Sequence, residues 1–361
     1  MERNENIKYR RWILGHFLIA SLMLAVVATF NYRVDSLGLF HPDKGLRYAM
    51  RNVLEGRMVA GLLPYHDREF QKMIVENSPS PAEIVVLGSS RSMELRGRFI
   101  VTQKTFFNHS VAGATLEDAI AITGVYKVRG RLPNTVILAL DPWMFNKNND
   151  TTRWQALMFY YKKMLTEIYG KALNIQRTRR YKYLELINGE YTLLNVKDFK
   201  KTRKIKEKRA QYTTTTTEVD DFVREPDGSL HYPLSMRDKK DEALRQAARR
   251  YVTKPERYFR DFHALSNLKL FEDFVNYLKG QGTRVVIHLS PFHPVAYEGI
   301  KEKFPMVLEA EDYLRDFASK QNILLMGSYD PAKYNFENKD FIDGSHGNEK
   351  VAKKIFEGFP L

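Results

Sequence analysis

The chain has 361 residues, enough for one large domain with insertions or for two small domains. Its net charge of +14 favours anionic partners such as lipid headgroups, acidic polymers or nucleic acid. The absence of cysteine excludes disulfides, cysteine-ligated zinc and a thiol nucleophile.

The first recognisable element is the apolar run WILGHFLIASLMLAVVATF at residues 12–30, which carries no formal charge. At about 1.5 Å per residue, a helix of this length matches the hydrocarbon core of a bilayer. Lys8, Arg10 and Arg11 precede the run, so the positive-inside rule predicts a cytoplasmic N-terminus at 1–11 and an extracytoplasmic remainder. We therefore expect an uncleaved, single-pass anchor in the cytoplasmic membrane. A cleaved signal peptide and a buried soluble helix are the alternatives.

Residues 31–80 are expected to link the anchor to the main domain, with a helical part around 44–61. From residue 81 to 361, short buried strands alternate with helices, which predicts an α/β fold with a parallel sheet covered by helices on both faces. The predicted strands are 84–87, 106–110, 135–140, 284–289 and 322–326. The predicted helices are 115–129, 263–279, 308–320 and 349–358.

An aromatic and basic segment interrupts this pattern at about 148–262. We expect it to form a partly helical insertion at the rim of the sheet, as a lid or a binding subdomain. Its most basic stretch, KDFKKTRKIKEKR at 197–209, is either a solvated helix face or a contact for anionic lipid or acidic glycan. Nucleic acid is not expected as a partner, because the segment matches no recognised nucleic-acid-binding motif.

Polar side chains follow the ends of the predicted strands, where ligands bind in parallel α/β sheets. The first strand runs into the pair Ser89 and Ser90, so either a serine only caps the next helix or one of the two is a nucleophile. The candidate substrate contacts at these strand ends are Ser89, Arg91, Asn108, Asp141 and His293.

Asp343 and His346 stand three residues apart, just before the last predicted helix. A serine hydroxyl is a weak nucleophile unless a neighbouring base takes its proton, and histidine suits that role near neutral pH. A carboxylate bonded to the other ring nitrogen fixes the tautomer and stabilises the imidazolium. The alternative is a capping aspartate beside a surface histidine. The order of serine, glycine and Asp-x-x-His along the strands favours the catalytic interpretation.

These residues resemble the sequence blocks of the SGNH (GDSL-like) hydrolases and acyltransferases. VLGSSRS has Ser90 at the position of the nucleophile, and NHSVAGATLED has Gly113 at the position of the oxyanion-hole glycine. Asp343 and His346 match the last block. The resemblance covers roughly 81–146 and 282–358.

The third block departs from the family, which usually has an oxyanion-donating asparagine there. LALDPWMFN places Asp141 at about that position, and a carboxylate donates only when it is protonated. Two donors would then remain, the N–H groups of Ser90 and Gly113. Asp141 could instead bind a substrate hydroxyl.

The resemblance implies a three-layer, flavodoxin-like domain with a Ser90, His346 and Asp343 triad that needs no cofactor and no metal. It is nearest to a membrane-tethered extracytoplasmic branch that includes the D-alanyl transfer protein of lipoteichoic acid synthesis and the alginate O-acetylation proteins. Members of this branch work beside membrane-bound O-acyltransferases. We therefore expect a serine esterase or O-acyltransferase that acts on a cell-surface glycan or polymer. An inactive glycan-binding or scaffold protein is the alternative.

The remaining candidates have weaker arguments. Arg91 either binds an anionic substrate group or pairs with a carboxylate of the fold. His293 follows the fourth strand and could contact substrate, whereas His288 within that strand is expected to be a core histidine. Trp143 and Phe145 are expected to pack beneath the insertion rather than to line an acyl or sugar pocket.

Overall fold

In the computed structural model, the chain forms two compact units. One unit comprises Met1–Gly45 with Gln176–Ala210, and the other comprises Leu46–Ile175 with Gln211–Leu361. This division differs from the predicted boundaries, because 46–80 folds with the α/β unit and 176–210 groups with the N-terminal helix. The residues that the structure describes are 2–35, 40, 43–62, 67–100, 103–149, 151–171, 181–189, 191–193, 195–196, 199, 211–253, 257–259 and 261–358.

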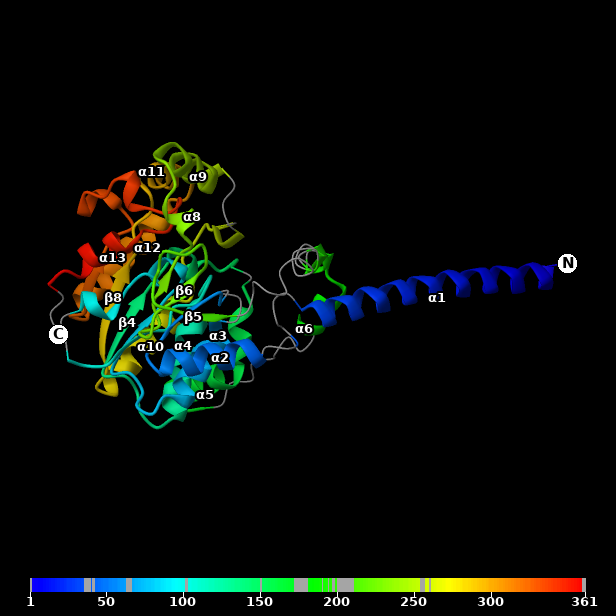
Figure 1. Cartoon of the computed structure of the whole chain (residues 1–361), viewed down its shortest axis with the longest axis horizontal. Helices are drawn as coiled ribbons and strands as arrows, with labels where there is room; N and C mark the ends of the chain where they lie inside the picture. Colours follow the sequence, from blue (N-terminus) through cyan, green and yellow to red (C-terminus); the bar gives the residue numbers. More distant parts are fainter. Residues whose placement is uncertain are drawn as a thin grey trace. The chain divides into compact units, whose positions relative to one another are not determined.

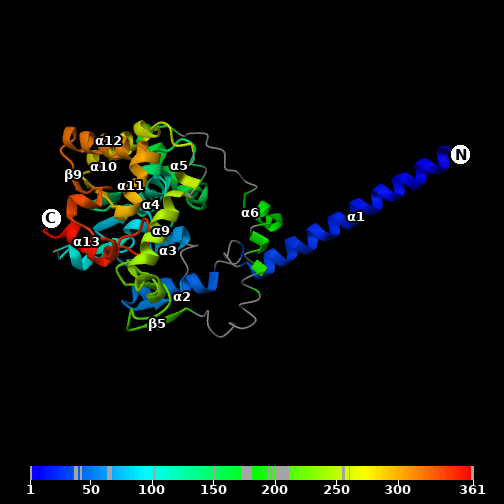
Figure 2. The same cartoon turned by 90° about the horizontal axis from the view of Figure 1, so that it is seen from above.

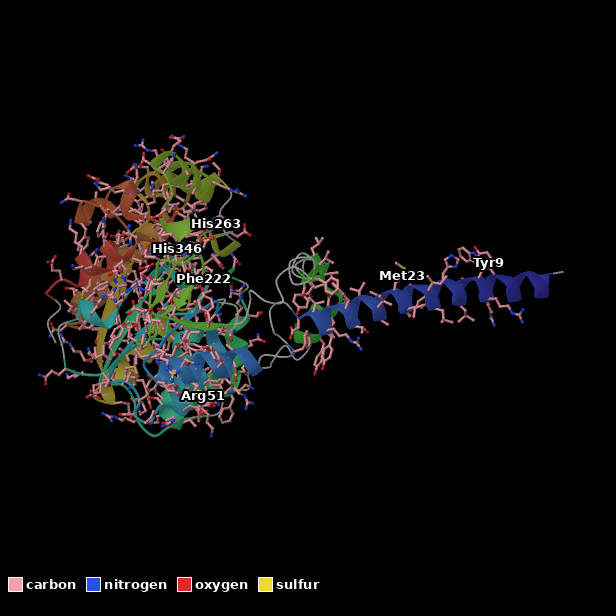
Figure 3. All side chains as sticks on the ribbon, in the orientation of Figure 1. Tyr9, Met23, Arg51, Phe222, His263 and His346 are labelled. Carbon is pink, nitrogen blue, oxygen red and sulfur yellow. The ribbon has the colours of Figure 1, made fainter. Side chains whose placement is uncertain are left out.

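The first unit is built on helix α1, Glu2–Val34. Its segment Tyr9–Val34 is long and apolar enough to be a candidate membrane span, by length and composition. Apolar side chains along this segment are exposed, including that of Met23 (Figure 3). Because no residue in the most apolar 18-residue stretch of this segment is buried, the segment is not a core helix of this unit.

Two short helical turns, α6 (Tyr181–Leu184) and η6 (Glu185–Ile187), lie near the end of α1 in the first unit. Asn31 donates to the carbonyl of Leu186 at 2.8 Å and accepts from Asn195 at 2.9 Å. The predicted basic run at 197–209 lies outside the described residues, apart from Phe199.

The second unit contains a five-stranded parallel sheet in the order β3-β2-β4-β8-β9. This confirms the predicted α/β class with a parallel sheet. The strands are β2 (Ile84–Leu87), β3 (Phe106–Asn108), β4 (Thr135–Ala139), β8 (Arg284–Leu289) and β9 (Leu324–Gly327).

Both faces of this sheet are buried, because alternate side chains of each strand enter different hydrophobic clusters. Val85 of β2 belongs to one cluster and Val86 to the other. Helices α4, α5, α10 and α12 pack on the first face, and α13 packs on the second (Figures 1 and 2). The helices of this unit are α2 (Asp43–Leu54), α3 (Asp67–Asn77), α4 (Leu116–Val128), α5 (Met158–Tyr169), α8 (Leu234–Arg237), α9 (Asp241–Thr253), α10 (Leu268–Gly280), α11 (Pro294–Lys303), α12 (Met306–Lys320) and α13 (Glu349–Phe356).

A second, antiparallel sheet has the order β5-β1-β6-β7 and was not predicted. It pairs Val59, from the predicted linking segment, with Thr213 and Arg224 of the predicted insertion. Its strands have only two or three residues, too few to produce a detectable alternation. They are β1 (Met58–Ala60), β5 (Tyr212–Thr214), β6 (Val223–Arg224) and β7 (Leu230–His231).

Candidate active site

Strand β2 ends in a tight turn in which the adjacent residues Ser89 and Ser90 have different surroundings. Ser89 is fully buried, and its hydroxyl accepts the N–H of Arg91 at 3.1 Å, so it caps the short helix that follows. Ser90 opens this helix, η2 (Ser90–Ser92), and is partly exposed. A Cβ added to Gly88 would lie 2.5 Å from the Cβ of Ala139, so only glycine fits at the turn. Ser89 is therefore a capping residue rather than a substrate contact.

Ser90, His346 and Asp343 lie in one chain of hydrogen bonds. Ser90 Oγ is 2.9 Å from His346 Nε2, and His346 Nδ1 is 2.9 Å from Asp343 Oδ2 (Figure 3 labels His346). Asp343 Oδ1 also accepts the backbone N–H groups of Ser345 and His346 at 2.8 and 2.9 Å. Burial opposes ionisation of Asp343, but the charge and hydrogen bonds of His346 and these N–H groups lower its pKa well below the usual value. The carboxylate is thus ionised and positioned to orient the imidazole.

Tyr232 follows β7 of the antiparallel sheet and contacts the turn at residues 88–92 that carries Ser90, here named the nucleophile turn. Its hydroxyl donates to the carbonyl oxygen of Ser90 at 2.9 Å, and its ring centroid lies 5.5 Å from that of His346 and 5.7 Å from that of Phe222. Burial raises the pKa of the Tyr232 phenol well above its usual value, so the phenol stays protonated and can donate. Sequence reasoning missed this residue because it lies 142 positions from Ser90 in a segment without a motif.

The loop at residues 110–115 presents backbone N–H groups beside the candidate nucleophile turn. The N–H groups of Ser110, Val111 and Ala112 already donate hydrogen bonds to other acceptors in the α/β unit. In the part of the chain that the structure describes, the N–H groups of Gly113 and Ser90 have no acceptor. Gly113 has a φ of +57°, a left-handed conformation that glycine adopts without strain. Both predicted oxyanion-hole donors are therefore available for a ligand.

Asn108 was predicted to contact substrate, but it is buried beneath the site. It is fully buried and donates to the carbonyl oxygens of Ser92 and Leu95 at 2.8 and 2.9 Å. Its side-chain oxygen accepts the N–H of Ser110 at 2.9 Å. Asn108 therefore joins the nucleophile turn to the 110–115 loop and does not reach a substrate.

Arg91 and Asp141 form a buried ion pair, with their side chains 1% and 4% exposed. Arg91 Nη1 lies 2.7 Å from Asp141 Oδ1, and Arg91 Nε donates to the carbonyl of Ser345 at 2.9 Å. The guanidinium also lies 3.8 Å from the ring centroid of Phe292. Burial raises the pKa of Asp141, and the charge of Arg91 opposes this rise. Of the two alternatives for Arg91, the structure has the pair with a carboxylate, and Asp141 is not exposed to a substrate hydroxyl.

The other candidate histidines are buried. His293 caps α11 by accepting the N–H of Val295 at 3.1 Å, and burial lowers its pKa to about 4. It is fully buried, which differs from the predicted contact at the rim. His288 is a core histidine as predicted, bonded to Ser290 at 3.0 Å, and His109 is bonded inside the core through both ring nitrogens.

The predicted insertion packs on two loops of the site. Gly344 lies between Asp343 and His346 in the sequence. A Cβ added to Gly344 would lie 2.7 Å from Tyr251 Cβ, so α9 contacts this loop directly. The turn η7 (Arg257–Phe259) reaches the 110–115 loop through Tyr258, whose ring stacks on Trp143 with centroids 5.3 Å apart. Trp143 is buried, as expected for a residue that packs beneath the insertion.

One group of acidic and histidine side chains in the described part of the chain has the spacing of metal ligands. Atoms of Glu94, His231 and Glu349 lie within 4.8 Å of one another. Arg96 Nη2 is 3.0 Å from Glu94 Oε2 and 2.7 Å from His231 Nδ1, so a guanidinium already supplies the positive charge. This donor set does not fit a metal cation.

Comparisons of the chain with protein-family models, curated proteins and solved structures find no match. The family resemblance therefore stays a prediction. What this site does has to be argued from its own geometry.

Proposed function

We propose that the chain is a membrane-tethered serine esterase or O-acyltransferase of the SGNH type. The observation that supports this most directly is the hydrogen-bonded chain from Ser90 through His346 to Asp343. A hydroxyl beside a histidine that a carboxylate orients is an arrangement that activates a serine for acyl transfer.

The proposed reaction begins when Ser90 Oγ attacks an ester carbonyl while His346 Nε2 takes the hydroxyl proton. The N–H groups of Ser90 and Gly113 donate to the oxyanion that forms. His346 then returns the proton to the leaving alcohol, and the acyl group stays on Ser90. Water or an acceptor hydroxyl, deprotonated by His346, finally attacks the acyl-enzyme. Asp343 holds the imidazole throughout and stabilises its charged form.

The proposed substrate is an acylated or acyl-accepting polymer of the cell surface. The net charge of +14 favours an anionic polymer, and the candidate span in α1 would hold the protein at a membrane. With Lys8, Arg10 and Arg11 on the cytoplasmic side, the α/β unit would lie outside the cytoplasmic membrane. A membrane-bound O-acyltransferase would be a suitable acyl donor there.

A second candidate is an inactive glycan-binding or scaffold protein with the same fold. Its support is the burial of Asp141 against Arg91, which leaves the loop after β4 without the usual side-chain donor. The loss of one oxyanion donor can lower the rate of acyl transfer by about 10²–10³-fold.

Hydrolysis of p-nitrophenyl acetate by the full-length protein in detergent distinguishes the two candidates. We expect an initial burst that reports acylation of Ser90, and a loss of about 10³-fold or more in Ser90→Ala and His346→Ala. The matched control is Ser319→Ala, which removes an exposed serine on α12 and should leave the rate unchanged. A folded wild type with neither burst nor turnover would favour the binding protein.

A further inference from the structure

Tyr258 places its phenol hydroxyl directly against Gly113. A Cβ built on Gly113 would lie 3.2 Å from Tyr258 Oη and 3.6 Å from Cζ. The hydroxyl therefore lies over the backbone of the residue whose N–H group is available for a ligand. Tyr258 is partly exposed.

The loop after β4 holds Tyr258 in this position. Trp143 stacks on its ring, with centroids 5.3 Å apart and planes inclined by 30°. Asn146 Nδ2 donates to the carbonyl oxygen of Tyr258 at 2.6 Å. Trp143 Nε1 also donates to the carbonyl of Ala114 at 3.1 Å, so one indole fixes both the phenol and the residue after Gly113.

Acyl transfer places a negative charge on the carbonyl oxygen, and donors fixed in advance around that oxygen stabilise the transition state. Two such donors are backbone N–H groups, of Ser90 and Gly113. Asp141 supplies none, because its carboxylate is buried against Arg91. A phenol hydroxyl is a neutral donor that keeps its proton while it hydrogen-bonds an oxyanion.

We propose that Tyr258 is a catalytic residue that donates a third hydrogen bond to the oxyanion, beside the N–H groups of Ser90 and Gly113. This inference rests on the proposed function of the same site. As Ser90 Oγ bonds to the carbonyl carbon, the π electron pair moves to the oxygen and the serine proton moves to His346. When the pair returns, the bond to the leaving alcohol breaks, and that alcohol takes the proton from His346. Tyr258 donates in both steps and loses no proton.

The test is Tyr258→Phe in the full-length protein, which removes the hydroxyl and keeps the ring that stacks on Trp143. We expect kcat for p-nitrophenyl acetate, and the rate of labelling by a fluorophosphonate, to fall about 10²–10³-fold. KM should be unchanged, because the oxyanion exists only after attack. Tyr313→Phe is the matched control. It removes a hydroxyl that donates to Glu272 on α10, outside the site, and should leave both rates unchanged.

The outcomes separate this inference from the proposed function. Loss of activity in Ser90→Ala and His346→Ala together with a wild-type rate in Tyr258→Phe would overturn only the role of Tyr258. A raised KM with unchanged kcat in Tyr258→Phe would also overturn it, by showing a ground-state contact. Full activity in Ser90→Ala would overturn the proposed function. An unfolding midpoint of Tyr258→Phe equal to that of the wild type shows that a lower rate is not a folding defect.

Discussion

Replacing Asp141 by asparagine tests whether the buried pair with Arg91 is structural. The family that the chain resembles usually has asparagine here, so Asp141→Asn would add a donor if this side chain faced the substrate. The structure predicts the opposite, because Arg91 would lose its only carboxylate partner within the described residues while its side chain remains 1% exposed.

The expected cost follows from the burial and the remaining partners. Removing one member of a buried ion pair destabilises a protein by about 3–5 kcal/mol, because an uncompensated charge stays buried. Arg91 would keep the carbonyls of Ser345 and Ser290 and the face of Phe292, which favours the lower end, about 3 kcal/mol. With about 2–4 °C for each kcal/mol, the unfolding midpoint should fall by roughly 6–12 °C.

The assay is thermal unfolding of the full-length protein in detergent, followed by tryptophan fluorescence. Asp316→Asn is the matched control, since it breaks an exposed pair with Lys320 that is worth at most about 1 kcal/mol. The double variant Arg91→Met with Asp141→Leu should recover most of the lost stability, because it removes both charges. An Asp141→Asn variant with an unchanged midpoint and higher esterase activity would refute this reasoning.

Three further substitutions address the surroundings of the site. Gly344→Ala should cost about 1–3 kcal/mol in urea unfolding and lower kcat, because its Cβ would meet Tyr251 Cβ at 2.7 Å; unchanged stability and activity would contradict this contact. Tyr232→Phe should cost about 1 kcal/mol and slow fluorophosphonate labelling, because the Ser90 carbonyl loses its side-chain donor and keeps only the N–H of Met93; an unchanged labelling rate would exclude the positioning role. Burial raises the pKa of Asp67 from 3.8 to about 6, so the folded state holds its proton more tightly and stability falls as pH rises through this window. Relative to Asp67→Asn, the wild type should lose up to about 3 kcal/mol in urea unfolding between pH 4 and 7, and a difference independent of pH would contradict the shift.

The parallel sheet could be predicted from sequence because most of its strands contain a short continuous apolar run, such as residues 136–139 of β4. Ser90, Asp343 and His346 could be selected because each stands in a short motif next to a strand end or a helix start. These local signals required no knowledge of the packing.

Burial and long-range pairing could not be predicted in the same way. Sequence shows that Arg91 and Asp141 are charged, but only the packing decides that they face each other rather than a substrate. Asn108 looks like a rim residue by position, yet its amide is used on backbone carbonyls of the nucleophile turn. Tyr232 and Tyr258 come from the predicted insertion, where no periodicity or motif indicated a contact with the sheet.

The most direct test of the proposed function is labelling of the full-length protein with a fluorophosphonate, with the adduct located by peptide mass spectrometry. An activated serine is predicted to give one adduct, on Ser90, whose formation is lost in His346→Ala and unchanged in Ser319→Ala. A folded wild type that stays unlabelled, or an adduct on Ser90 that forms equally fast in His346→Ala, would contradict it.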